Sequence, residues 1–150
     1  MPDTIQRGVV AGLLGTMGDI IVHGLALLTL GTSMTGHYIN QIIFPFLKIT
    51  GLKYGISEIT HFIAGALIGI FIVLIFKYYG SDYPYLKGIG LSVLLWVVHV
   101  AVIPNLVSLN PRPYLHRTET EAIVDLIAHI TYGVIATMYL IKTRKRIAVR

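Results

Sequence analysis

Four long apolar runs dominate the sequence and limit what the chain can fold into. They lie near residues 8–30, 57–78, 88–107 and 120–141. An α-helix needs about 20 apolar residues to cross the hydrocarbon core of a bilayer, and each run is long enough to do so. We therefore predict an all-α fold, an antiparallel bundle of four transmembrane helices that forms a single domain over residues 1–150.

The composition excludes a water-soluble domain. Only 13% of the residues are charged, whereas a soluble domain carries about 25%. So few charges cannot cover the surface of a small soluble fold. The chain has no cysteine, which excludes disulfides, thiolate metal ligands and thiol catalysis. The first apolar run lacks the pattern of a cleavable signal peptide, so we expect it to remain as a helix.

The net charge of +5 is better explained by membrane topology than by nucleic-acid binding, because the cations flank the apolar runs. Placing both termini in the cytoplasm puts more lysine and arginine inside than outside. The inside set is Arg7, Lys77, Lys87, Lys142, Arg144, Lys145, Arg146 and Arg150, and the outside set is Lys48, Lys53, Arg112 and Arg117. We predict a multi-pass protein of the cell membrane whose partner is membrane lipid. No nucleic-acid partner is expected, and a homo-oligomer is left open.

The first outer loop is long, at about residues 31–56. It carries apolar residues interrupted by Pro45, with Ile39, Ile42, Ile43, Phe46 and Leu47 among them. Two interpretations fit this pattern: a short interfacial or re-entrant helix over the bundle, or an apolar loop that rests on lipid. His37 and His116 lie in predicted loops, and we expect both to be solvated.

Each apolar run contains one histidine, and three runs also contain a nearby carboxylate. The histidines are His23, His61, His99 and His129, and the carboxylates are Asp19, Glu58 and Asp125. Each carboxylate precedes its histidine by three or four residues, the spacing that puts two side chains on one helix face. A charged residue at the centre of a membrane helix costs about 2.5–3.5 kcal/mol. We therefore expect these groups to face the bundle interior and to find partners there.

Small residues continue the same faces, which predicts close helix contacts toward the cytoplasmic side. The four stripes are Gly8, Gly12, Gly15, Asp19 and His23; Glu58, His61, Gly65 and Gly69; Gly88, Ser92, Leu95 and His99; and Glu121, Asp125, His129, Tyr132 and Ala136. At about 1.5 Å rise per residue, the four histidines reach similar depths in the outer half of the bundle. We predict that they converge there.

Imidazole and carboxylate groups together suit a divalent transition metal, with zinc or iron the first expectation. The histidines would be ligands, and Asp19, Glu58 and Asp125 would be ligands, would orient the ligands, or would act as general bases. Glu58-x-x-His61 has the spacing found in soluble di-metal bundles. The other pairs are spaced by four, and the run at 88–107 has no carboxylate, so the full di-metal pattern is not expected. A metal-dependent enzyme with a membrane-associated substrate is one consequence.

Two alternatives remain open. Two of the histidines could be the axial ligands of a haem. The histidines and carboxylates could instead move protons or metal ions, or sense them, without catalysis.

Three features make the chain resemble a group of four-helix integral membrane proteins that are sporulation-associated in spore-forming bacteria. They are the glycine-rich start of the first run, Pro104-Asn105 at the end of the third, and Tyr132-Gly133 in the fourth. The resemblance spans most of the chain. It implies a membrane protein with four helices and says nothing about the histidines.

Overall fold

The computed structural model describes residues 4–32, 50–103 and 118–148, with side chains as far as residue 143. Its elements are α1 (Thr4–Leu30), α3 (Thr50–Tyr78), α4 (Pro84–Val97), the π-helical turn η1 (Val98–Val102) and α6 (Glu119–Ala148). Four helical segments are long and apolar enough to cross a membrane: Thr4–Leu30, Gly51–Tyr78, Pro84–Val102 and Glu119–Thr143. The predicted all-α, four-helix class is therefore confirmed.

One predicted boundary is wrong. The first outer loop was expected to extend to about residue 56, but α3 already begins at Thr50. The sequence prediction followed hydropathy, whereas a helix can continue past the apolar run because its hydrogen bonds do not depend on lipid. The Ser57 hydroxyl also donates to the backbone oxygen of Lys53 over 2.9 Å, which ties this side chain to the preceding turn of α3. The predicted interfacial helix, His37, His116 and Pro104-Asn105 lie outside the described residues.

Local chemistry sets the start of two helices. Thr118 and Glu121 form a capping box before α6: the Glu121 backbone N–H donates to Thr118 Oγ1 at 3.2 Å, and the Thr118 N–H donates to Glu121 Oε2 at 3.0 Å. Pro84 lies in the first turn of α4, where its missing N–H has no cost. The turn before it contains Gly80 at φ +76°, a conformation that glycine adopts without strain.

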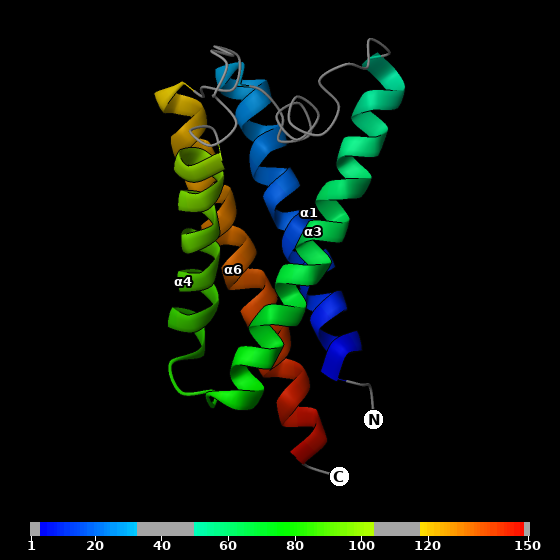
Figure 1. Ribbon diagram of the computed structural model, residues 1–150, viewed down its shortest axis with the longest axis vertical. Coiled ribbons are helices and arrows are strands. Elements are labelled where there is room, and N and C mark those ends of the chain that lie inside the picture. The colour runs from blue at the N-terminus through cyan, green and yellow to red at the C-terminus, as the bar shows by residue number, and fades with distance from the viewer. Residues whose placement is uncertain (1–3, 33–49, 104–117, 149–150) are drawn as a thin grey trace.

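The helices form an arc in the order α3, α1, α6, α4. Helix α1 packs against α3 and α6, and α4 packs against α6, whereas α3 and α4 barely contact each other. In Figure 1, α3 and α4 approach each other near the turn that joins them and diverge toward the opposite end. Both termini lie at the end that carries this turn.

Glycines hold the helices together in the half nearer the termini. A Cβ at Gly8 would lie 2.6 Å from Ile70 Cα, and one at Gly69 would lie 2.6 Å from Gly12 Cα. A Cβ at Gly133 would similarly lie 2.8 Å from Ile89 Cα of α4. These separations leave no room for a side chain, so the predicted close contacts along the glycine stripes are confirmed. We call this part of the molecule the glycine half.

Large apolar side chains cover the outside of the bundle. Leu28 is 83% exposed, and Ile63, Phe71 and Leu94 are also largely exposed. The buried core is made of small or aliphatic groups and one aromatic ring: Ala11, Ile72, Val73, Tyr132, Ala136 and Leu140. Apolar groups on the outside fit a lipid environment, in agreement with four helical segments that are long and apolar enough to cross a membrane. The orientation of the chain in the membrane stays a prediction.

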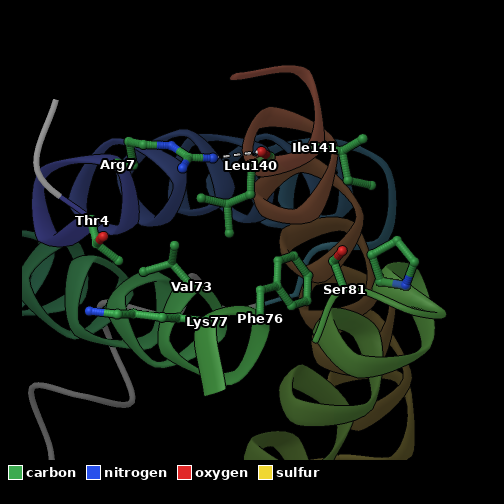
Figure 2. Close-up of a pocket in the computed structure, with 9 residues that line it drawn as sticks. Thr4, Arg7, Val73, Phe76, Lys77, Ser81, Leu140 and Ile141 are labelled. Atoms are coloured by element: carbon green, nitrogen blue, oxygen red, sulfur yellow. Dashed lines mark hydrogen bonds between the residues drawn. The ribbon is translucent and has the colours of Figure 1, made fainter. Parts of the chain in front are cut away.

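A cavity of about 480 Å³ lies at the end of the glycine half, among α1, α3, α6 and the start of α4 (Figure 2). The Arg7 guanidinium donates to the Leu140 backbone oxygen over 2.9 Å, so it serves as a clamp between α1 and α6. In Figure 2, Lys77 extends in the opposite direction from Arg7. The two cations therefore do not converge on one point of this cavity.

Candidate metal centre

The four predicted histidines come together next to the glycine half, on its side away from the termini. Asp19 and His23 are on α1, His61 is on α3, and His99 lies in η1. Asp125 and His129 are on α6. Ion-pair distances connect all six side chains, so the predicted convergence of the four histidines is confirmed. Their location in the outer half of the membrane stays a prediction. We call this group, Asp19, His23, His61, His99, Asp125 and His129, the His/Asp cluster.

Asp125 lies at the centre of the cluster and is fully buried. Its Oδ1 is 3.4 Å from His23 Nε2, and its Oδ2 is 3.6 Å from His99 Nδ1. His129 Nδ1 is 3.8 Å from Oδ1. One carboxylate therefore lies beside imidazoles from three different helical segments, which is the arrangement expected when the negative charge of a buried carboxylate must be balanced locally.

Asp19 extends the cluster to α3. Its Oδ2 is 3.3 Å from His61 Nε2 and 3.9 Å from His23 Nε2. His23 thus lies between the two aspartates. Imidazole and carboxylate groups alternate across the bundle from His61 to Asp19, His23 and Asp125.

Glu58 differs from the two aspartates. Its Oε2 is 3.9 Å from His61 Nδ1, and its side chain is 32% exposed. It lies at the edge of the cluster, beside one histidine only among the described residues. The sequence grouped it with Asp19 and Asp125, and the structure separates it from them by burial.

Several buried polar atoms of the cluster have no hydrogen-bond partner among the described residues. They are Asp19 Oδ2, both ring nitrogens of His23, and His61 Nδ1. Three of these atoms lie 3.3–3.9 Å from an ionisable neighbour, but none of these contacts has hydrogen-bond geometry. A buried polar group without a hydrogen bond costs about 1–3 kcal/mol, so such groups are rarely left in this state. The cluster therefore has the donor chemistry of a site that binds an ion or a small polar ligand.

His99, Asp125 and His129 form the part of the cluster best suited to one metal ion. Each offers one ligand atom, and these atoms lie within 4.8 Å of one another. The His129 Nδ1–H donates to the Asp125 backbone oxygen over 2.8 Å, which leaves Nε2 with a lone pair for a metal. The rings of His99 and His129 have centroids 5.8 Å apart. Two histidines and one carboxylate are a ligand set of both zinc and non-haem iron sites.

The π-helical turn that carries His99 was not predicted. The sequence suggested a continuous helix over 88–107, but the Ile103 N–H donates to the Val98 oxygen, the wider spacing of a π-turn. Such turns often occur at functional sites because they change the direction of side chains within a helix. Pro104 was a sequence signal that a regular α-helix would not continue here, because proline lacks a backbone N–H and clashes with the preceding turn, although Ile103 itself keeps helical dihedral angles.

A second cavity, of about 310 Å³, lies beside the His/Asp cluster. It is lined by Thr16, Asp19, Thr60, His61, Ala64, Gly65, Ile68, Ser92, Leu95, Val98, His99, Ile103, His129 and Tyr132. The Tyr132 hydroxyl donates to the Gly65 oxygen over 2.6 Å and so joins α6 to α3. Tyr132 also belongs to the apolar core, so its ring connects the wall of this cavity with the core. The sequence correctly predicted that Tyr132 lies on the same helix face as Asp125 and His129, but it did not indicate that Tyr132 joins α6 to α3.

The comparisons with known proteins do not assign this site. No protein-family model matches the sequence, and no curated protein or solved structure matches it. The resemblance to sporulation-associated membrane proteins therefore stays a prediction.

Proposed function

We propose that the protein is an integral membrane metalloprotein that binds a divalent transition metal, zinc or iron, through His99, Asp125 and His129. The supporting observation is that one ligand atom from each of these residues lies within 4.8 Å of the other two. Ligand atoms around one tetrahedral zinc are roughly 3.4 Å apart. Small side-chain rotations would therefore bring this group to metal-binding geometry.

The rest of the cluster would hold these ligands in place. His23 Nε2 lies 3.4 Å from Asp125 Oδ1, so it can orient that carboxylate, and Asp19 lies beside both His23 and His61. Groups of this kind hold metal ligands in the correct tautomer and direction. His61 is a further candidate ligand from the opposite helix.

A metal with three protein ligands keeps a position for water or substrate, as catalytic zinc sites do. Two of the proposed ligands, His99 and His129, line the 310 Å³ cavity. A metal-dependent enzyme is the consequence we favour, with the metal activating a water. Asp19 and, less directly, Glu58 are the candidate general bases, because Asp19 lines the cavity and Glu58 lies beside His61.

Elemental analysis of the purified full-length protein tests the metal site. We expect about one equivalent of zinc or iron, and we expect His99→Ala to lower the metal content by at least about tenfold, because a three-ligand site depends on each ligand. Ser92→Ala is the matched control, since Ser92 lines the same cavity but donates its hydroxyl to the Gly88 oxygen of its own helix. A metal content far below one equivalent that His99→Ala does not change would contradict the proposal.

A metal-free proton network is the second candidate. It is favoured by the alternation of acids and imidazoles from Glu58 through His61, Asp19 and His23 to Asp125, with distances of 3.3 to 3.9 Å. Proton flux in liposomes that stops in His23→Ala, together with metal-free wild-type protein, would favour this function over the first. A haem site would be recognised by a Soret band, which would support bis-histidine ligation instead.

A further inference from the structure

The cavity beside the His/Asp cluster opens toward the side of the bundle. Most of its lining comes from two helical segments, α3 and α4 with η1. These two segments follow each other in the chain but form the two ends of the arc, and they barely contact each other, in contrast to α1 with α3 or α4 with α6. In Figure 1 the two helices diverge from their connecting turn. The side of the bundle between α3 and α4 is therefore the one where the helices are held together by the fewest contacts.

The outer surface of the bundle around this opening is apolar, as expected for a surface that contacts lipid hydrocarbon. On α3, Ile63 and Leu67 are exposed beside the lining residue Ala64, and on α4, Leu94 is exposed beside the lining residue Leu95. These residues belong to segments that are long and apolar enough to cross a membrane. A molecule that reaches the cavity by this side would come from the membrane and not from water.

The cavity reaches the histidines themselves. The side chains of His61, His99 and His129, which line it, are 14%, 18% and 17% exposed. The side chain of His23, which does not line it, is 2% exposed. The remaining lining is largely apolar and includes Ala64, Ile68, Leu95, Val98 and Ile103. The cavity thus has a polar inner end and apolar walls.

We propose that this cavity binds a single-chain lipid with an oxygen-bearing head, such as a fatty acid, which enters from the membrane between α3 and α4. The head would meet the His/Asp cluster, and the chain would lie between Ala64 and Leu95. The volume of about 310 Å³ is at the low end of ligand cavities, which span roughly 300–1,000 Å³. It suits a head with the first part of one chain, whereas a two-chain phospholipid is too large. The role of the head as a metal ligand rests on the proposed function, but lateral entry does not.

Photolabelling tests this inference. Full-length protein in nanodiscs would be irradiated with a fatty acid that carries a diazirine near its carboxyl end, and the label would be mapped by mass spectrometry. We expect labelling of residues 60–68 and 92–103. Ala64→Phe should lower it by about tenfold, which corresponds to ~1.4 kcal/mol, because the ring displaces about two methylenes of the chain. Ile21→Phe is the matched control, because Ile21 is 60% exposed on α1, which does not flank the opening, and does not line the cavity; it should label like the wild type.

The opposite wall provides a second pair of variants in case Ala64→Phe does not fold. Leu95→Trp should lower labelling, whereas Leu28→Trp, at an exposed position of α1 that does not line the cavity, should not. Equal labelling within both pairs, or label confined to the outer face, would overturn the inference. Metal content is measured on the same samples. Normal metal without cavity labelling removes the lipid site alone, and cavity labelling without metal removes the proposed metal site alone.

Discussion

The two halves of the bundle differ in how closely their helices pack and in which side chains fill the interior. In the glycine half, the helix backbones are in direct contact, the core is apolar, and close packing holds the helices together. In the half with the His/Asp cluster, α3 and α4 diverge and ionisable side chains fill the interior. Membrane helices gain little from apolar burial, because lipid is as apolar as a side chain, so close packing of small residues is the main source of cohesion. The glycine half therefore provides the stability that lets the other half keep a cavity and several ionisable groups.

Substitution of a stripe glycine should have the largest effect on this division. Gly69→Leu places a side chain where a Cβ alone would lie 2.6 Å from Gly12 Cα. We expect a loss of about 3 kcal/mol or more in unfolding free energy, because overpacking against backbone cannot be relieved by a rotamer change. Thermal unfolding in detergent measures it.

Gly90→Leu is the matched control for this change. Among the described residues, a Cβ at Gly90 meets nothing within 4 Å. This variant should unfold at or above the wild-type temperature, since leucine favours a helix by up to about 1 kcal/mol over glycine. Equal losses in Gly69→Leu and Gly90→Leu would show that helix packing is not what the stripe provides.

The two acids nearest His61 should differ in their effect on metal binding. Asp19 lies between His23 and His61 and is buried, whereas Glu58 is partly exposed at the edge. We expect Asp19→Asn to weaken metal affinity by about 10- to 100-fold, the usual cost of losing a group that orients ligands. Glu58→Gln should have a smaller effect, since an exposed ion pair contributes about 0–1 kcal/mol. Competition with a chelator measures both affinities, and a larger effect for Glu58→Gln would contradict the assigned arrangement.

Removal of the Tyr132 hydroxyl should have the smallest effect and should act on the boundary between the halves. Tyr132→Phe keeps the ring, which a Cβ at Gly15 would approach to 2.7 Å, and loses the hydrogen bond to Gly65. We expect a loss of about 0.5–1.5 kcal/mol in stability with metal content unchanged. A large loss of metal together with normal stability would instead place Tyr132 in the site itself.

The sequence by itself determined the class of fold, the apolar spans and the faces of the helices. These features depend on local composition and on helical spacing, so they can be read without knowing how the helices meet. The same spacing put Asp19 with His23 and Asp125 with His129, and it placed Gly65 and Gly69 on the contact face of their helix. The convergence of the four histidines followed from the cost of exposing ionisable groups to lipid.

Only the tertiary structure decided which position each residue on these helix faces takes in the cluster. Asp125 became the centre of the cluster and Glu58 its edge because the glycine contacts set how deeply α1, α3, α4 and α6 lie against one another. The divergence of α3 from α4 likewise follows from the packing of α3 on α1 and of α4 on α6, and the π-turn at His99 does not show in the spacing of apolar residues. Helical periodicity describes one helix at a time. The order of the helices in the arc, and hence the open side of the cavity, is a property of their packing.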